Sequence, residues 1–191
     1  MKVYNQQEAK LNPERLAYDI NKGAIFVYPT DTIYGIGCNA RDNQSVQKIR
    51  KIKGRQKMPF SVIAPSKEWI YENCEVGETA KSWIEEKLPG PYTFILKLNN
   101  HNAISKHVIP DINTIGVRIP DHWCSDVVSR LNIPLITTSA NISGHTFMTS
   151  LEDMHPHIKA HINFALCDGE LHGKPSKIID FSQKEIKIKE R

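Results

Sequence analysis

A continuous apolar run, Ala24-Ile25-Phe26-Val27-Tyr28, ends abruptly in the polar turn Pro29-Thr30-Asp31-Thr32. An apolar run without alternation is typical of a strand that is buried on both faces, inside a sheet covered by helices. A helix is predicted just before it, because Asn12 can cap that helix, Pro13 suits its first turn and Gly23 can end it. This part of the chain therefore predicts an α/β fold.

Helices and strands continue to alternate along the chain. Helices are predicted at 43–53, 67–73, 79–88 and 121–131, and strands at 60–64, 92–98, 114–119, 135–138, 162–166 and 177–181. The close spacing of the late strands favours a mixed sheet over a purely parallel one. Residues 184–191 alternate charged and apolar side chains, as an exposed edge strand does. No linker or internal repeat interrupts the pattern, so residues 1–191 are expected to form one domain.

The composition narrows the class of protein. Of the 191 residues, 40% are hydrophobic and 24% are charged, which is ordinary for a globular protein. No apolar run approaches the roughly 18 residues of a membrane-spanning helix, and the first residues lack the apolar stretch of a signal peptide. We therefore expect a cytoplasmic protein with no membrane contact. The net charge of +4 permits an anionic ligand or RNA without requiring either.

The residues that most often bind metals are not arranged for it. His155, His157 and His161 have a spacing that fits no standard zinc signature, so no metal site is predicted. The cysteines form no CxxC pair and are expected to be free, partly buried thiols: Cys38, Cys74, Cys124 and Cys167.

Polar residues interrupt the pattern where strands or helices end, and open α/β sheets bind ligands at such ends. In residues 29–37, Gly35 and Gly37 are expected to let the backbone approach a ligand closely. The alternative is a tight turn in which Asp31 or Thr32 caps backbone groups.

A second such segment holds Lys53 and Arg55 at a predicted helix end, with Lys57 close behind. These residues suit a phosphate clamp, although basic residues also favour a helix C-terminus without any ligand. The phosphate-binding loop GxxxxGK[ST] is absent, so a nucleotide would have to be held in another way.

Two later strands also carry polar side chains. Thr114, Gly116 and Arg118 share one strand face, where Arg118 needs an anion. That anion is either an internal carboxylate, such as Asp121 or Asp126, or the carboxylate of a substrate. In residues 135–144 an apolar strand runs into hydroxyls and an amide, and Ser139 and Asn141 would share one face. Helix capping and ligand binding both account for this cluster, and ligand binding is favoured because buried polar groups need partners.

Together these segments resemble the YrdC/Sua5 family of threonylcarbamoyl-adenylate synthases. The matching motifs occur in the family's order over nearly the whole chain: PTDTIYGIG (29–37), KGR (53–55), LPGPYTFIL (88–96), TIGVRIP (114–120), TTSANISG (137–144) and PSKIID (175–180). The length corresponds to the family's short, single-domain form.

The resemblance implies a twisted mixed parallel and antiparallel sheet flanked by helices, with a positively charged concave cavity. It also implies the reaction: L-threonine, bicarbonate or CO2 and ATP, with Mg²⁺, give threonylcarbamoyl-AMP and pyrophosphate. The product would then be handed to a tRNA threonylcarbamoyl transferase complex, which modifies adenosine 37 of tRNAs that read ANN codons.

The resemblance also assigns roles to residues. Thr32 and Ser176 are expected to contact threonine, and Arg118 to pair with its carboxylate. Lys53, Arg55, Ser139 and Asn141 match a catalytic tetrad that handles the ATP phosphates and the carbamate. Nucleotide contacts are expected from two further residues, Thr114 and Thr149.

The chain departs from the family's pattern in three places. The loop after Arg55 is one residue shorter than the commonest version, Lys177 replaces a threonine, and a terminal arginine-glycine segment is reduced to Arg191.

Two other functions stay open from the sequence. One is an RNA-binding module that uses the basic residues without catalysis, although the aromatic stacking pattern of single-stranded RNA binders is lacking. The other is formation of a carbamoyl-adenylate for a different acceptor.

Overall fold

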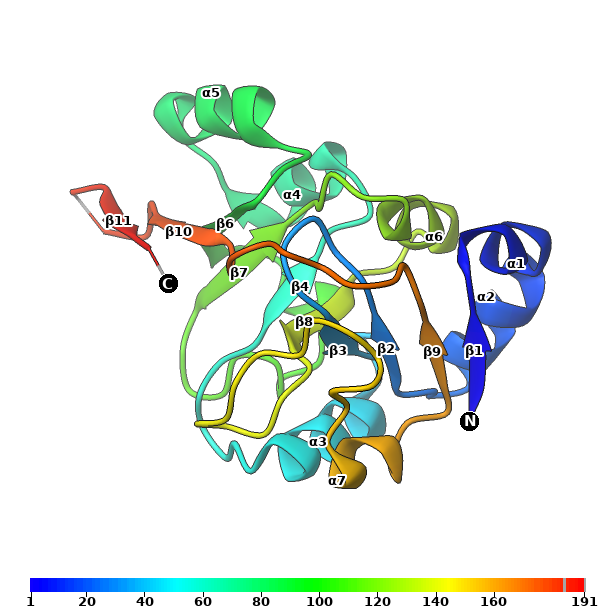
Figure 1. The fold of residues 1–191 in the computed structure, drawn as a ribbon. Coiled ribbons are helices and arrows are strands. Elements are labelled where there is room, and N and C mark those ends of the chain that lie inside the picture. Colours follow the sequence, from blue (N-terminus) through cyan, green and yellow to red (C-terminus); the bar gives the residue numbers. More distant parts are fainter. Residues whose placement is uncertain (184, 191) are drawn as a thin grey trace.

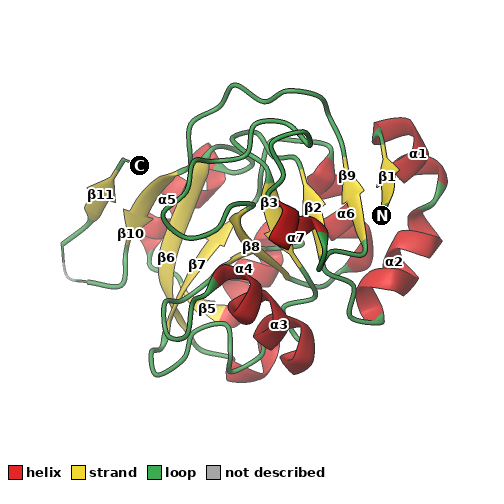
Figure 2. Cartoon of the chain, turned by 60° about the horizontal axis from the view of Figure 1, so that its bottom comes forward, coloured by secondary structure: helices red, strands yellow, loops and turns green. Residues whose placement is uncertain are grey.

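The strands of the computed structural model, which describes residues 1–183 and 185–190, form one mixed sheet of eleven strands. Its order is β1-β9-β2-β3-β8-β4-β7-β6-β10-β11, with β5 attached to β6. The N-terminal strand and the C-terminal strand therefore lie at opposite edges of the sheet (Figures 1 and 2). The predicted mixed α/β sheet is confirmed.

The strands are β1 (Lys2–Tyr4), β2 (Phe26–Tyr28), β3 (Gly35–Gly37), β4 (Ser61–Ile63), β5 (Cys74–Glu75), β6 (Tyr92–Leu98), β7 (Thr114–Arg118), β8 (Leu135–Ser139), β9 (Phe164–Leu166), β10 (Lys177–Asp180) and β11 (Lys187–Lys189). The helices are α1 (Gln6–Leu11), α2 (Pro13–Asn21), α3 (Asn43–Lys53), α4 (Lys67–Asn73), α5 (Glu78–Lys87), α6 (Cys124–Leu131) and α7 (Pro156–Lys159), with a 3₁₀ turn at His101–Ala103.

The two faces of the sheet are covered to different extents. On one face, α3, α4, α5 and α7 pack into the larger hydrophobic core, together with the inward side chains of β6, β7 and β8. On the other face, α1, α2 and α6 form a smaller core with side chains of β2, β9 and the start of β8. On this second face, Ile63 of β4 still joins the smaller core, whereas the neighbouring positions of β4, β7, β6 and β10 carry a mixture of polar and apolar side chains that line a groove.

Helix α3 has clear boundaries that fix the position of its last residue. The Asp42 side chain accepts hydrogen bonds from the backbone N–H groups of Gln44 and Ser45, which caps the start of the helix. Gly54 ends the helix with a φ of 62°, a left-handed conformation that suits glycine. Lys53 therefore lies at the last turn, as predicted, and this turn faces the end of β8.

The glycines of β3 have a packing role that the sequence did not predict. A side chain on Gly35 would contact the ring of Tyr28, and one on Gly37 would collide with the backbone of Ile136 as well. The missing side chains make room for Tyr28, whose hydroxyl donates to the Ile136 carbonyl at 3.0 Å. These glycines therefore have a role in internal packing, and close backbone approach to a ligand stays a prediction for Gly35, which lines the small cavity described below.

The edges and thiols agree with the sequence analysis where they are described. Lys187–Lys189 pair with β10 as an edge strand, whereas Lys184 and Arg191 lie outside the described residues. All four cysteines are free, and only Cys167 is not fully buried. Across residues 1–183 and 185–190, we find no helix with the length and apolar character needed to cross a bilayer.

Candidate active site

A small cavity of about 50 Å³ lies at the partly covered face of the sheet, between the turn after β2 and the strands β4, β7 and β8. Hydroxyl side chains dominate its wall, and one guanidinium group reaches it. The lining hydroxyls come from Thr30, Thr32, Ser61, Thr93, Thr137, Thr138, Ser139 and Ser176, and the guanidinium is that of Arg118.

Arg118 is buried, with 6% of its surface exposed, and its guanidinium lies against the turn after β2. One Nη atom donates to the carboxylate of Asp31, and the other lies 3.3 Å from Thr32 Oγ1. Its Nε has no hydrogen-bond partner among the described residues, although it is fully buried. An unpaired buried donor is costly, so this group is suited to a ligand that brings an acceptor.

Asp31 is the internal carboxylate that pairs with Arg118, in place of Asp121 or Asp126 considered from the sequence. Its other oxygen accepts the backbone N–H of Asp121 at 3.0 Å. Asp31 therefore fixes the guanidinium and ties the turn after β2 to the end of β7. Asp31 thus both accepts a hydrogen bond from a backbone group and supplies the anion that Arg118 requires.

The segment that precedes β10 crosses over this cavity. Ser176 is buried, and its hydroxyl lies 2.8 Å from that of Thr93 on β6. A side chain on Gly173 would collide with the backbone of Thr32, so the two backbones are in close contact. The Tyr34 hydroxyl donates to the Gly169 carbonyl at 2.7 Å. These contacts hold the crossing segment against the cavity that it covers.

A wider groove of about 320 Å³ adjoins the cavity along the same face of the sheet. The two share the side chains of Ser61, Thr93, Thr137 and Thr138, so they lie next to each other along the sheet. The groove is further lined by Arg55, Met58, Ile112, Thr114, Ile178 and Lys189. Met58, in the shortened loop, thus lies at the groove.

Lys53 does not extend into this groove. Its side chain has no exposed surface, and its Nζ donates to the Ser139 carbonyl at 2.6 Å, to the Asn141 carbonyl and to Asn141 Oδ1 at 3.0 Å. Burial, with a smaller contribution from Arg55, lowers the pKa of Lys53 to about 7. All three donors of the ammonium group are therefore used to fix the loop that carries Ser139 and Asn141.

Arg55, unlike Lys53, borders the groove. Its Nε lies 3.2 Å from Ser143 Oγ, and one Nη lies 3.3 Å from Thr138 Oγ1. Both distances are at the long end of the hydrogen-bond range, so a phosphate could replace these partners at little cost. Burial lowers the pKa of Arg55 from its ordinary value, and the group stays charged at neutral pH.

The structure brings the four tetrad residues together. Ser139 Oγ donates to Asn141 Oδ1 at 2.6 Å, and the Asn141 amide donates to the His145 carbonyl at 2.6 Å. The Lys53 ammonium group contacts both Ser139 and Asn141 from the buried side of this cluster. The prediction that both cations face the hydroxyl-amide cluster across one hollow is wrong for Lys53, which is buried behind the loop, whereas Arg55 lines the groove and Ser139 lines the small cavity.

The other predicted residues divide into two groups. Thr32, Arg118 and Ser176 line the small cavity, and Thr114 lines the groove. Thr149 is bound within its own loop, where its hydroxyl donates to Asp153 at 2.9 Å. The structure therefore does not bring Thr149 to the groove.

Five lining hydroxyls were not singled out from the sequence: Thr30, Ser61, Thr93, Thr137 and Thr138. All except Thr30 share a feature that could have identified them, namely their positions on nearby strands of the sheet. Ser61 pairs with Gly116 on one side and with Thr137 on the other. Small and hydroxyl residues at matching positions of adjacent strands form one row. That row becomes visible only when the strand order is known.

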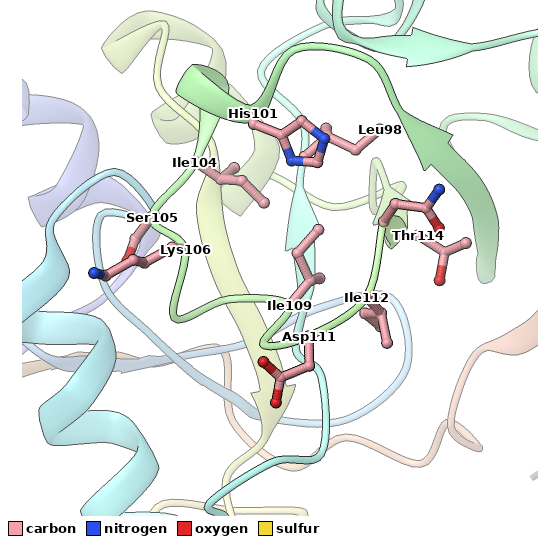
Figure 3. A pocket seen from close by; sticks show the side chains of 10 residues that line it. Leu98, His101, Ile104, Ser105, Lys106, Ile109, Asp111, Ile112 and Thr114 are labelled. Atoms are coloured by element: carbon pink, nitrogen blue, oxygen red, sulfur yellow. The ribbon is translucent and has the colours of Figure 1, made fainter.

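A third hollow, of about 630 Å³, lies under the loop between β6 and β7. Figure 3 shows Ile104, Ile109 and Ile112 pointing toward its interior. It meets the groove at Ile112 and Thr114, which line both. At this end the groove borders a hollow whose wall combines Leu98 and three isoleucines with polar side chains such as His101, Lys106 and Asp111.

The fold and the site define an α/β protein with a buried arginine at one end of a ligand cavity and a second arginine beside the adjoining groove. The Sua5/YciO/YrdC family model, whose description reads "Telomere recombination", matches residues 19–191. The chain therefore belongs to the Sua5/YciO/YrdC family.

Two curated relatives have names that refer to one enzyme. A protein of Methanocaldococcus jannaschii is 37% identical over 97% of this chain and 89% of its own length, and its name assigns it provisionally as a threonylcarbamoyl-AMP synthase. The mouse threonylcarbamoyl-AMP synthase is 30% identical over 73% of this chain. This chain covers 51% of the mouse protein.

Solved structures of the family match the fold. P. abyssi Sua5 complexed with L-threonine has a TM-score of 0.86 and 26% identity, over 98% of this chain and 56% of Sua5. E. coli YciO has a TM-score of 0.85 over 100% of this chain and 94% of YciO, and its 21% identity supports the fold alone.

Proposed function

We propose that this protein is a threonylcarbamoyl-AMP synthase that uses L-threonine, bicarbonate or CO2 and ATP. The observation that carries the proposal is a hydroxyl-lined cavity with a buried arginine, next to a groove that a second arginine borders. The names of the relatives support it, as does the L-threonine bound to P. abyssi Sua5. Arg55 and Arg118 would give the groove and the cavity a positive potential for anionic substrates.

Threonine occupies the small cavity in this proposal. Its carboxylate takes a position near the guanidinium of Arg118, which lines the cavity. The hydroxyls of Thr32 and Ser176 contact the amino acid from the turn and from the crossing segment. A cavity lined by fixed hydroxyls favours a side chain that itself carries a hydroxyl.

ATP occupies the groove, and Mg²⁺ arrives bound to the triphosphate as part of the substrate. Arg55 contacts the phosphates, while Ser139 and Asn141 position the reacting groups. Lys53 acts through its contacts with those two residues, so we assign it a positioning role. Thr114 contacts the nucleotide at the border with the third hollow. Thr149 would reach a nucleotide only after releasing Asp153.

The reaction then needs two bonds to form. The threonine amine attacks CO2, loses a proton to solvent and becomes a carbamate. A carbamate oxygen attacks the α-phosphorus of ATP, and the bond from that phosphorus to the bridging oxygen breaks to release pyrophosphate. This chemistry depends on positioning and charge neutralisation, which Arg55 and Arg118 can supply.

We further propose that the product passes to a tRNA threonylcarbamoyl transferase complex in the cytoplasm. Threonylcarbamoyl-AMP is a reactive mixed anhydride, so a dedicated acceptor is expected. Direct tRNA binding would use the basic residues near the groove and would weaken steeply with salt.

Pyrophosphate release from ATP tests the proposal. We expect release that requires both threonine and bicarbonate, and that is much slower with serine or without an amino acid. Absence of release, together with salt-sensitive retention of tRNA, would instead favour a non-catalytic RNA-binding module. Release with bicarbonate that does not depend on threonine would favour a carbamoyl-adenylate for another acceptor.

A further inference from the structure

Arg50 of α3 is buried, and its side chain holds the loop that follows the helix. One Nη atom donates to the carbonyls of Arg55, Gln56 and Met58 at 3.2, 3.1 and 3.1 Å. Within residues 1–183 and 185–190, residues 56–59 make no other hydrogen bond. The conformation of this loop therefore depends on the Arg50 guanidinium.

The same side chain joins this loop to a second one. Its Nε donates to the His107 carbonyl at 2.6 Å, and its other Nη donates to the Val108 carbonyl at 3.2 Å. The guanidinium also lies over the ring of Phe60, with Cζ 4.7 Å from the ring centroid. In the part of the chain that the structure describes, no salt bridge involves Arg50. Backbone carbonyls, rather than an acidic side chain, therefore stabilise this buried charge.

Arg50 holds the backbone of Arg55 from both sides. The Arg55 N–H donates to the Arg50 carbonyl at 3.0 Å, and the Arg55 carbonyl accepts a hydrogen bond from the Arg50 guanidinium. The Arg55 side chain, by contrast, has only its long hydrogen bonds to Ser143 and Thr138. Arg50 thus sets the point from which the Arg55 side chain extends along the groove.

From this geometry we propose that Arg50 is a positioning residue for nucleotide binding, which fixes the Arg55 backbone so that the Arg55 side chain meets the phosphates. The inference rests on the proposed function, because it assigns the groove to ATP. The described residues that line the cavity and the groove do not include Arg50, so it acts through Arg55. A guanidinium supplies five donors in a planar fork, and a lysine ammonium group cannot reproduce that geometry.

The position of Arg50 predicts which kinetic constants it affects. Arg50→Lys keeps a positive charge but loses the fork, so Arg55 is no longer fixed. The KM for ATP should rise by roughly tenfold, with the KM for threonine changed by less than about twofold. A loss of stability alone would lower kcat through the fraction of folded enzyme and would leave both KM values unchanged.

A double variant tests whether Arg50 acts through Arg55. In an Arg55→Ala background, Arg50→Lys should lower kcat/KM for ATP by less than about twofold further, because the side chain that Arg50 positions is absent. An effect of Arg50→Lys in this background as large as in the wild-type background would overturn the inference.

The experiment measures ATP binding by calorimetry, both KM values from pyrophosphate release, and trypsin cleavage after Lys57. Arg41→Lys is the matched control, because Arg41 is exposed and also donates to a loop carbonyl, that of Ala103. Arg50→Lys should bind ATP more weakly than the control protein and be cleaved faster after Lys57. Arg50→Gln gives the same readouts if Arg50→Lys does not fold.

Equal ATP affinity in the Arg50→Lys and Arg41→Lys proteins would overturn the inference. Calorimetry reports on Arg50 even if the wild-type protein binds ATP without releasing pyrophosphate, which is the result that would instead reject the proposed function.

Discussion

The two ends of the site hold their cations in different ways. At the closed end, Arg118 is buried, paired with Asp31 and covered by the segment that carries Ser176. At the other end, Arg55 is held only by two long hydrogen bonds, and Lys189 is exposed at the edge of the sheet. The closed end is preorganised before any ligand binds, whereas the groove end has cations that can adjust to one.

This difference indicates separate tasks. A small cavity lined by fixed hydroxyls can discriminate between similar small molecules, because a wrong group leaves buried polar atoms unpaired. An exposed cationic groove instead supplies attraction that is less selective and depends on salt. We therefore expect amino-acid specificity to arise at Arg118 and nucleotide affinity at Arg55.

The largest effect is expected at the closed end. Arg118→Gln should lower kcat/KM for threonine by about 10³-fold, because a buried charge that pairs with a substrate anion is lost. The KM for ATP should change by less than about threefold. Steady-state pyrophosphate release at varied threonine and ATP separates the two constants.

Removing Arg118 also leaves Asp31 as a buried carboxylate without its cation, which destabilises the fold. The double variant Arg118→Gln, Asp31→Asn removes both charges and should recover stability but not activity. Recovery of threonine-dependent turnover in that double variant would contradict the role of Arg118 in binding threonine.

At the groove end, Arg55→Ala should lower ATP-dependent turnover by about 10²-fold through lost charge stabilisation. The loss should appear in the constants for ATP while the KM for threonine changes little. Lys57→Ala, in the loop just beyond, serves as the control. Normal turnover in the Arg55→Ala protein would remove the main argument for nucleotide binding in the groove.

The burial of Lys53 is tested by the pH dependence of the protein's stability. Its pKa is about 7 in the fold and 10.5 in the unfolded chain, so between these pH values the unfolded chain binds more protons. Wild-type stability should then rise with pH relative to Lys53→Met, by up to about 1.4 kcal/mol per pH unit. Urea unfolding at pH 7, 8 and 9 measures this slope, and parallel pH profiles for the two proteins would argue against a buried Lys53.

The smallest effect is expected at the cover of the closed end. Ser176→Ala removes a neutral hydrogen bond to Thr93 and one wall of the cavity. The KM for threonine should rise by roughly fivefold, with the KM for ATP unchanged. If Thr93→Val and the double variant Ser176→Ala, Thr93→Val give the same rise in this KM, the two hydroxyls act as one unit.

The sequence predicted most of the fold because the periodic elements also have clear end signals. Helix 43–53 has Asp42 before it and Gly54 after it, and its observed bounds equal the predicted ones. Strand 92–98 is likewise confirmed, since Pro91 and the polar residues after Leu98 delimit it. The family resemblance and the mixed sheet are also confirmed.

Two of the missed strands depend on tertiary contacts, whereas the missed helix α1 has a local signal, the capping box formed by Asn5 and Glu8. Strand β3 is only Gly-Ile-Gly, which has low intrinsic strand preference, and it exists because Tyr28 packs over its glycines. Strand β1 is three residues long and pairs with β9 from the far end of the chain. No local pattern could have shown either pairing.

For the site, too, local sequence predicted some features and missed those that depend on tertiary contacts. The motifs pointed to Lys53, Arg55, Ser139 and Asn141, and these residues lie close together in the structure. The motifs did not show that all three donors of Lys53 bind protein oxygens. The partner of Arg118 was also wrong, because Asp31 lies 87 residues away in the sequence while Asp121 and Asp126 are close to it. Local sequence indicates which residues are needed, and only the fold determines their partners.

The central claim is that the cavity and the adjacent groove join an amino acid to a nucleotide through a carbamate. Mass spectrometry of the product formed from threonine, ATP and ¹³C-bicarbonate tests it most directly. We predict threonylcarbamoyl-AMP that carries one ¹³C atom in the wild-type protein, and a strong loss of this product in both Arg118→Gln and Arg55→Ala. Labelled product at the wild-type rate in either variant, or no labelled product in the wild type, would contradict the account.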